Sequence, residues 1–297
     1  MQLSEAIGQY ALWRGLKIRP KTLLGDDMNL RHFCIFAKDP KLIDVKISDI
    51  IEFLNLARKM GFEENTILKK AIALKKFFEY WVAQGLSGLS VALIPVPRRQ
   101  FVLPHIADNN GFQKLLDVIG DRIWDVRNRA MILMQGQSGA RIGEILAIDV
   151  CHLNEDLLGA EIKTEKSRGR RPFRRIYWKQ EAKNALDIWL EKRQNLLGNR
   201  RMDALFICVK GGSPKAEKFK RLELQGATEV YRKYSVRAGI PTLNSHSLRH
   251  KLGRDLAMRG ANNATISSIL GHANLASSYY YTELFGDDVK RQFEKYT

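Results

Sequence analysis

The sequence predicts a mainly α fold with a small β-sheet or hairpin in its C-terminal domain, an α+β class built from two domains. Apolar residues recur at three- and four-residue spacing along most of the chain, as they do in amphipathic helices. Two runs between residues 157 and 178 alternate enough to be two paired strands. The length of 297 residues suits two compact domains, each with its own core.

Residues 1–92 are predicted to form a helical domain of four helices, which begin near residues 3, 22, 48 and 65. Ser48 is suited to the N-cap of the third helix, and Gly61 is suited to ending it. Asn65 or Thr66 would cap the fourth helix. The fourth helix also carries four lysines, Lys69, Lys70, Lys75 and Lys76. Taken alone, such a run is most often a solvated helix face.

The net charge of +17 gives those lysines a second interpretation. Such an excess of positive charge predicts an anionic partner, and nucleic acid is the first candidate, with a merely basic protein as the alternative. Residues 93–106 are expected to be a linker, because periodicity fails there and prolines favour extended backbone. Arg98 and Arg99 in this linker would suit DNA if the two domains clamp a duplex.

Three cysteines, Cys34, Cys151 and Cys208, lie far apart, so neither a disulfide framework nor a zinc site is predicted. The N-terminus lacks the basic and apolar regions of a signal peptide, and no apolar run reaches transmembrane length. We therefore expect a cytoplasmic protein, associated with the nucleoid if the source is bacterial, with no membrane partner.

Residues 107–297 are expected to form the second domain, with a basic hairpin and a C-terminal tail helix. Its predicted helices and strands cover residues 111–119, 125–134, 157–165, 173–178, 181–197 and 225–238. The turn of the hairpin holds four of its many cations, Lys166, Arg168, Arg170 and Arg171. In the tail, Phe285, Val289 and Phe293 lie four residues apart and form one apolar stripe.

The stretch between His246 and Tyr281 contains the residue types that suit chemistry on a phosphodiester. His246 and Arg249 lie three residues apart, on one face of a helix. His272 follows a glycine that is suited to ending a helix. An arginine can hold the non-bridging oxygens, a histidine can move a proton or donate a hydrogen bond, and a tyrosine can attack the phosphorus.

Metal and nucleotide cofactors are not predicted. His246 and His250 are four residues apart and could share a metal ion, but no third ligand is evident, so His250 is interpreted as structural. The glycine-rich segment at residues 211–215 lacks the spacing of a phosphate-binding loop and is interpreted as an ordinary turn.

The motif region resembles that of the tyrosine recombinases, the phage-integrase and Xer family. In that family a His-x-x-Arg pair is followed by Leu-Gly-His, and a tyrosine comes nine residues after that histidine. His246, Arg249, His272 and Tyr281 stand at those places, and the nine-residue step selects Tyr281 over the two tyrosines before it. Residues 138–145 resemble the family's Thr-Gly-Leu-Arg-Ile-x-Glu-Leu segment, which gives Arg141.

The resemblance implies an N-terminal SAM-like core-binding domain joined to a tyrosine-recombinase catalytic domain, of the short Xer- or Cre-like type. The implied catalytic residues are Arg141, Lys166, His246, Arg249, His272 and Tyr281. In the family a hairpin lysine protonates the leaving 5′ oxygen, and Lys166 is favoured over Lys163 because it lies at the turn. The expected DNA-binding residues are Lys69, Lys70, Lys75, Lys76, Arg98, Arg99, Arg168, Arg170 and Arg171.

The implied function is site-specific DNA recombination through a 3′-phosphotyrosine intermediate and a Holliday junction, with no cofactor. The implied partners are double-stranded DNA with paired inverted half-sites and further protomers, as a dimer on each site and a tetramer in the synapse, or an Xer-like hetero-partner. The same resemblance implies that the tail helix docks into a neighbouring protomer. The alternative is that its apolar stripe folds back on its own domain. The alternatives are a type IB topoisomerase-like relaxing enzyme and a non-catalytic DNA-binding regulator.

Overall fold

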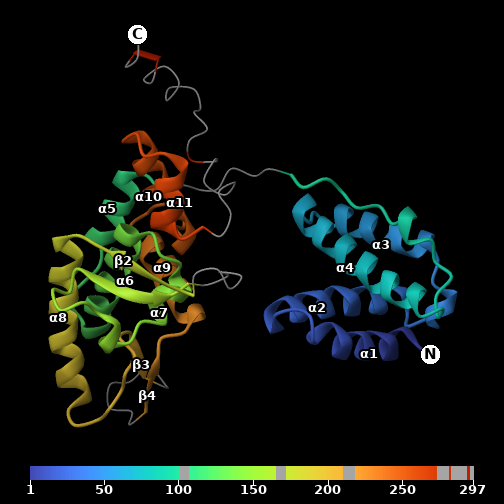
Figure 1. Cartoon of the computed structure of the whole chain (residues 1–297), viewed down its shortest axis with the longest axis horizontal. Coiled ribbons are helices and arrows are strands. Elements are labelled where there is room, and N and C mark those ends of the chain that lie inside the picture. The colour runs from blue at the N-terminus through green and yellow to red at the C-terminus, as the bar shows by residue number, and fades with distance from the viewer. Residues whose placement is uncertain (101–106, 165–171, 210–217, 273–280, 282–292, 295–297) are drawn as a thin grey trace. The chain divides into compact units, whose positions relative to one another are not determined.

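The computed structural model describes residues 1–100, 107–164, 172–209, 218–272, 281 and 293–294 of the 297-residue chain. The chain divides into two compact units, Met1–Leu103 and Pro104–Thr297, which are coloured from blue to red in chain order in Figure 1. Each unit has a hydrophobic core of its own. The described part of the chain contains no helix that is long and apolar enough to cross a membrane.

Four α-helices make up the first unit, as the sequence predicts. They are α1 (Leu3–Gly15), α2 (Pro20–Ala37), α3 (Ile47–Lys59) and α4 (Glu64–Ala83), with short 3₁₀ turns at Leu42–Asp44 and Val91–Leu93. Aromatic side chains fill the core, where the rings of Tyr10 and Phe77 meet edge to face at 5.3 Å between centroids.

Two helix starts differ from the prediction. Helix α3 begins at Ile47, two residues earlier than a Ser48 cap would give, because the N-cap is Lys46, whose backbone N–H donates to the Asp49 carboxylate at 2.8 Å. Helix α4 begins at Glu64, so Asn65 and Thr66 lie inside it. Gly61 ends α3, as predicted. It lies just past the C-cap of the helix and has a φ of +80°.

Lys70 is a correction to the predicted basic face of α4. Its side chain is only 5% exposed because position 70 lies on the same stripe as buried Ile67, Ala71 and Leu74. The ammonium group lies 5.3 Å from the ring centroids of both Phe53 and Phe62, and burial lowers its pKa. By contrast, Lys69 and Lys76 are exposed and Lys75 is half-buried, so these three lysines remain available to an anion.

The described part of the second unit is mainly helical and contains two small antiparallel hairpins. Its helices are α5 (Asn109–Asp117), α6 (Ile123–Ser138), α7 (Ile142–Leu146), α8 (Gln180–Leu197), α9 (Leu224–Arg237), α10 (Ser245–Met258) and α11 (Asn263–Leu270), with a 3₁₀ turn at Val150–His152. Strands β1 (Gly159–Lys163) and β2 (Phe173–Tyr177) pair with Ala160 opposite Ile176. Strands β3 (Ile207–Val209) and β4 (Phe219–Arg221) form the second hairpin.

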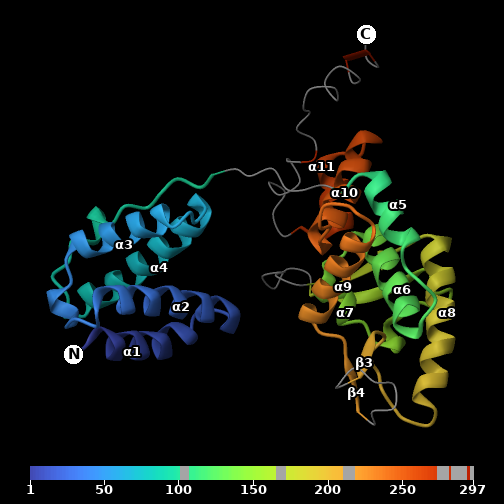
Figure 2. The same cartoon turned by 180° about the vertical axis from the view of Figure 1, so that it is seen from behind.

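The second hairpin is not anticipated by the sequence pattern, since strands of three residues are too short to show an alternation. Figures 1 and 2 show this hairpin at one end of the second unit and helices α10 and α11 at the opposite end. The basic turn with Lys166, Arg168, Arg170 and Arg171 lies outside the described residues, as does the tail except Phe293 and Glu294.

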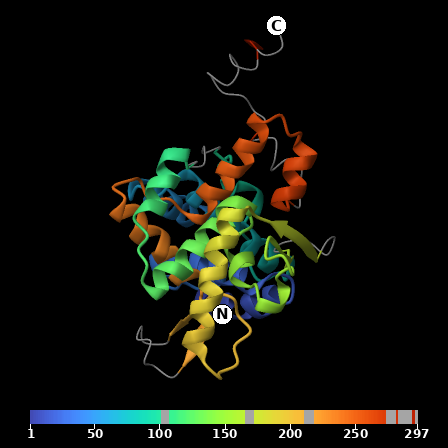
Figure 3. The same ribbon diagram turned by 90° about the vertical axis from the view of Figure 1, so that its left-hand side faces the viewer.

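Helix α6 forms the centre of the second unit and packs against α8 and α10. Figure 3 shows α8 as the long yellow helix that runs down this unit. Buried polar groups on α6 are satisfied by neighbouring elements: the Gln135 amide N–H donates to the Ser245 carbonyl at 2.8 Å, and the Tyr231 hydroxyl donates to the Gln135 side chain. These bonds fix α9 and the start of α10 relative to α6.

Replacing Trp189 by alanine is expected to destabilise the second unit by about 3–5 kcal/mol, because it empties a large core position. The indole of Trp189 is fully buried, and its N–H donates to the Leu205 carbonyl at 2.9 Å. Hydrogen exchange followed by mass spectrometry on the full chain should show lost protection in residues 107–272 and unchanged protection in residues 1–100. Ile188→Ala is the matched control, because that neighbouring side chain is 49% exposed. Equal loss of protection in both units would contradict two independent cores.

Candidate active site

Arg141 is held by a tight turn between α6 and α7. Gly139 ends α6 with a φ of +64°, and an added Cβ there would lie 2.5 Å from Leu270 Cδ2, so glycine is needed for both reasons. The turn places Arg141 at the N-cap of α7. Its guanidinium donates to the Gly271 carbonyl at 3.4 Å and to Glu144 Oε1 at 2.9 Å.

Arg249 projects from α10 toward the same turn. Asn244 is the N-cap of this helix, and its side chain accepts the Ser247 N–H at 2.9 Å. Arg249 is 4% exposed, and its Nη1 donates to the Gly139 carbonyl at 2.6 Å. Among the described residues its buried Nη2 has no hydrogen-bond partner. Burial, followed by the charge of Arg141, lowers the pKa of Arg249 to about 10.

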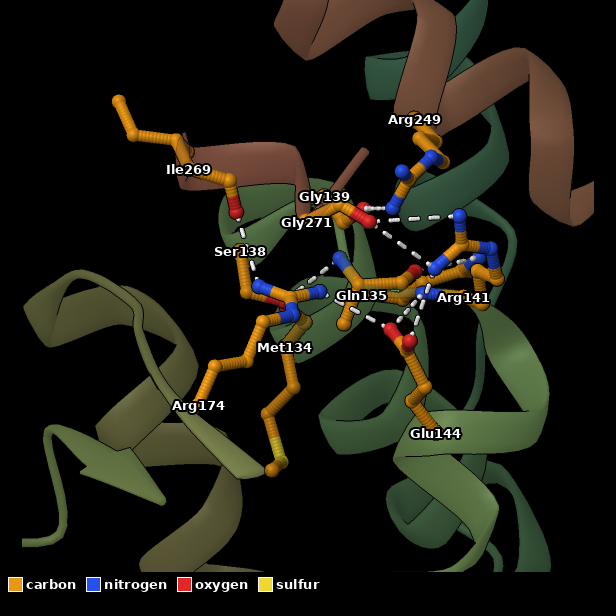
Figure 4. Close-up of polar contacts among 11 residues, drawn as sticks. Met134, Gln135, Ser138, Gly139, Arg141, Glu144, Arg174, Arg249, Ile269 and Gly271 are labelled. Atoms are coloured by element: carbon orange, nitrogen blue, oxygen red, sulfur yellow. Dashed lines mark hydrogen bonds and ion pairs between the residues drawn. The ribbon is translucent and has the colours of Figure 1, made fainter. Parts of the chain in front are cut away.

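The fully buried carboxylate of Glu144 lies between two guanidinium groups, as Figure 4 shows. Its Oε1 accepts from Arg141, and its Oε2 accepts from Arg174 Nη2 at 2.9 Å. Arg174 comes from strand β2 and also donates through Nη1 to the Ile269 carbonyl at 2.9 Å. With Arg249, three guanidinium groups gather around one carboxylate. The cluster therefore keeps an excess of positive charge and suits a phosphate anion.

Tyr281 lies against α10 and is 6% exposed. Its Oη is 2.8 Å from His250 Nδ1, and its ring stacks on the His272 ring with centroids 6.0 Å apart. A glycine allows this approach, since an added Cβ at Gly253 would lie 2.7 Å from the Tyr281 ring. Gly271 ends α11 with a φ of +67° and so directs His272 toward the tyrosine.

The two histidines beside Tyr281 are neutral at neutral pH. Burial, together with the charges of His246 and Arg249, lowers the pKa of His250 to about 4. Burial, and then the charges of Arg249 and Arg141, lowers the pKa of His272 to about 3. A neutral imidazole can accept the phenol proton of a tyrosine or donate an N–H to an oxyanion.

The site brings together most of the residues expected from the sequence. Arg141, Arg249, His272 and Tyr281 are linked through the contacts above. His246 lies one helical turn before His250, with the two ring centroids 6.4 Å apart. Lys166 lies outside the described residues, and Lys163 is exposed on β1.

The sequence interpretation of His250 as structural did not foresee that its Nδ1 lies against the phenol oxygen of Tyr281. Glu144 and Arg174 were not singled out from the sequence. Glu144 lies in residues 138–145, the segment that gives Arg141, and the sequence alone assigns no catalytic role to its carboxylate. Arg174 is one of many cations in the hairpin, but its strand exposes residues 173, 175 and 177, so the period of two already puts residue 174 on the inner face.

The remaining expected DNA-binding residues on the first unit are solvent-accessible. Arg98 and Arg99 are exposed, as are Lys69 and Lys76. Within the described ranges no group of three His, Cys, Asp or Glu side chains could hold a metal ion.

Acid is expected to destabilise the fold through His250 and His272. Because both folded-state pKa values lie below the ordinary value of 6.5, the unfolded chain binds more protons between about pH 3 and 6.5. Their contribution is complete above pH 6.5 and is lost as the pH falls toward 4 and 3. Without any allowance for exposure each would remove about 1 kcal/mol from the unfolding free energy between pH 6.5 and 5.5, and because both rings are partly exposed the expected loss is smaller.

Urea unfolding of the wild type and of His250→Gln and His272→Gln at pH 7.5 and 5.5 checks this linkage. Glutamine does not titrate, so each variant should lose less stability between the two pH values than the wild type. An identical loss in all three proteins would show that these histidines do not resist protonation.

Two family matches cover most of the chain. Residues 107–286 match the phage integrase family, and residues 8–85 match the phage integrase N-terminal SAM-like domain. The tyrosine recombinase XerC of Actinobacillus succinogenes is 32% identical over 232 residues, which cover 77% of this chain and 73% of the relative. The tyrosine recombinase XerD of Oceanobacillus iheyensis is 26% identical over 255 residues, 84% of this chain and 81% of the relative.

Solved structures agree on the fold. A Tn1549 transposon integrase in complex with a circular intermediate DNA aligns with a TM-score of 0.73 and 17% identity, over 99% of each chain. A lambda integrase dimer bound to a core site aligns with a TM-score of 0.73 and 15% identity, over 95% of this chain and 96% of that one. Together with the site geometry, the matches lead to one conclusion: the chain belongs to the phage integrase family and is a tyrosine recombinase related to the Xer proteins.

Proposed function

We propose that this chain is a site-specific recombinase that cleaves and rejoins DNA strands through a 3′-phosphotyrosine intermediate. The observation that carries the proposal is the Tyr281 phenol, 2.8 Å from a neutral imidazole and stacked on a second one. Tyr281, Arg141, Arg249, His246 and His272 are the proposed catalytic residues, with Lys166 as the proposed acid and His250 added from its contact with Tyr281.

In the proposed cleavage step, Arg141 and Arg249 hold the non-bridging oxygens of the scissile phosphate. The Tyr281 oxygen forms a bond to phosphorus while the bond from phosphorus to the 5′ oxygen breaks. The phenol proton passes to His250, and the departing 5′ oxygen takes a proton from Lys166. The two guanidinium groups and an N–H of His272 offset the negative charge that develops on the phosphorane oxygens.

The phosphotyrosine bond retains the energy of the cleaved linkage, so a free 5′ hydroxyl can reverse the step without ATP. When that hydroxyl belongs to a second duplex, one strand is exchanged and a Holliday junction forms. The proposed assembly is a dimer on each pair of inverted half-sites and a tetramer in the synapse, built from this chain or with an Xer-like partner. The proposed cellular location is the cytoplasm, at the nucleoid.

The proposed division of labour follows the two units. Residues 1–92 would clamp DNA through Lys69, Lys75 and Lys76, residues 93–106 would link the units with Arg98 and Arg99, and residues 107–297 would carry the chemistry. The turn cations Arg168, Arg170 and Arg171 would contact the backbone near the scissile phosphate. The tail after Tyr281 would dock into a neighbouring protomer.

A topoisomerase-like relaxing enzyme uses the same strand cleavage but needs only one protomer and one duplex. Two plasmid substrates distinguish a recombinase from a relaxing enzyme. One plasmid carries a single selected site, and the other carries two. A recombinase changes the connectivity of the two-site plasmid, whereas a relaxing enzyme removes supercoils from both. A non-catalytic regulator would bind the site and form no covalent adduct.

Tyr281→Phe is expected to abolish the covalent adduct and to retain DNA affinity, because only the attacking oxygen is removed. The probe is a nicked suicide duplex carrying a site that the wild-type chain selects from random-sequence DNA. Adducts that resist SDS are counted on a gel, in EDTA and without ATP, and affinity is measured by filter binding. Adduct from Tyr281→Phe would assign the nucleophile to another residue, for which Tyr280→Phe is the first comparison.

Gly253→Ala is expected to slow adduct formation by about 10- to 100-fold, because the new methyl group displaces the tyrosine ring and with it the nucleophile. Alanine favours a helix over glycine by about 1 kcal/mol, so the variant should not lose helix stability. The same suicide duplex at saturating protein gives the rate. Gly8→Ala, in helix α1 where an added Cβ meets nothing within 4 Å, is the control. Wild-type cleavage by Gly253→Ala would mean that Tyr281 attacks from a different position.

A further inference from the structure

Arg174 joins three segments that are distant in sequence. It lies on β2, and its guanidinium reaches Glu144 on α7 through Nη2 and the Ile269 carbonyl at the end of α11 through Nη1, both at 2.9 Å (Figure 4). Gly271 packs so closely on it that an added Cβ would collide with Arg174 Nε. The side chain is 11% exposed. The Arg174 guanidinium is therefore held in place by contacts within the domain and is not available as a surface contact for DNA.

The two partners of Arg174 each lead to a proposed catalytic group. Glu144 accepts from both the Arg141 backbone N–H and the Arg141 guanidinium, each at 2.9 Å. The Ile269 carbonyl belongs to the last turn of α11, whose glycine cap precedes His272. Arg174 therefore constrains Arg141 through one bond and the His272 turn through the other.

Charge gives Arg174 a second effect on Arg141. A buried carboxylate must be neutralised, and here two guanidinium groups share that task. Without Arg174, Arg141 would be the nearer and stronger partner of Glu144. Its guanidinium would be drawn toward the carboxylate, and its charge would be less available to a phosphate.

We propose that Arg174 is a positioning residue for strand cleavage, which fixes Glu144 and the His272 turn so that Arg141 meets the scissile phosphate in the productive geometry. The inference rests on the proposed function. A lysine cannot fully replace Arg174, because a single ammonium group does not reach both Glu144 and the Ile269 carbonyl as a planar guanidinium does.

The test compares Arg174→Gln and Arg174→Lys with the wild type on two suicide duplexes of the selected sequence. One carries the ordinary scissile phosphate, and the other carries a methylphosphonate, in which a methyl group replaces one charged non-bridging oxygen. Single-turnover adduct formation is measured at saturating protein, so that differences in DNA affinity do not enter the rate. Arg175→Gln is the matched control, since it is the next residue on β2 and faces the exposed side.

On the phosphate duplex, Arg174→Gln should cleave about 100-fold more slowly than the wild type, and Arg174→Lys about 10-fold more slowly. On the neutral methylphosphonate, which needs less help from Arg141, the deficit of Arg174→Gln should shrink to about 5-fold or less. Arg175→Gln should cleave both duplexes at nearly the wild-type rate. Adding Glu144→Gln to Arg174→Gln should slow cleavage little further, because both changes act on one unit.

An equal slowing of Arg174→Gln on both duplexes, or no slowing, would overturn the assignment, since a merely structural role affects the two substrates alike. If Arg174→Gln does not fold, as judged by circular dichroism, Arg174→Lys decides by the same comparison of duplexes. The wild type separates the two proposals: if it forms no adduct on selected DNA, the proposed function fails before the role of Arg174 is reached.

Discussion

The buried carboxylate of Glu144 is the interaction on which the site depends. A carboxylate taken out of water costs several kcal/mol unless strong partners surround it. Here Arg141 and Arg174 supply them from opposite sides, one from the turn after α6 and the other from strand β2. The stabilisation works in both directions, because the negative charge of Glu144 also allows the guanidinium groups of Arg141 and Arg174 to lie near one another. Arg249 then adds a further positive charge, and an anion is the natural complement of the cluster.

Three glycines bring the elements close enough for these contacts. Gly139 fits between side chains of α10 and α11, Gly271 lies against the Arg174 side chain, and Gly253 lies under the Tyr281 ring. Two of the three also have positive φ values and end helices, so each sets a chain direction as well as a close approach. An added Cβ at any of the three would come too close to a neighbouring side chain, namely Leu270, Arg174 or Tyr281, which would then have to move.

Burial and the positive charge of the site together set the state of its histidines. Burial is the larger cause that lowers the pKa of His250 and His272, and the charge of Arg249, which also attracts a phosphate, disfavours the protonation of both. Neutral imidazoles beside a phenol can take its proton, which a charged imidazolium cannot. The electrostatic environment of the site thus affects phosphate binding, the protonation state of the histidines and the activation of Tyr281 together.

The helical class and the basic character can be predicted from the sequence alone, because helix periodicity and composition are local signals, and the resemblance to the family's motifs indicates the site residues. It placed Arg141, Arg249, His272 and Tyr281, but not the way in which they are held. Tertiary structure alone decided that Lys70 is buried, that His250 meets the phenol and that Arg174 shares Glu144 with Arg141. The last two facts depend on contacts between residues 31 and 30 positions apart in the chain, and no local pattern encodes which segments meet.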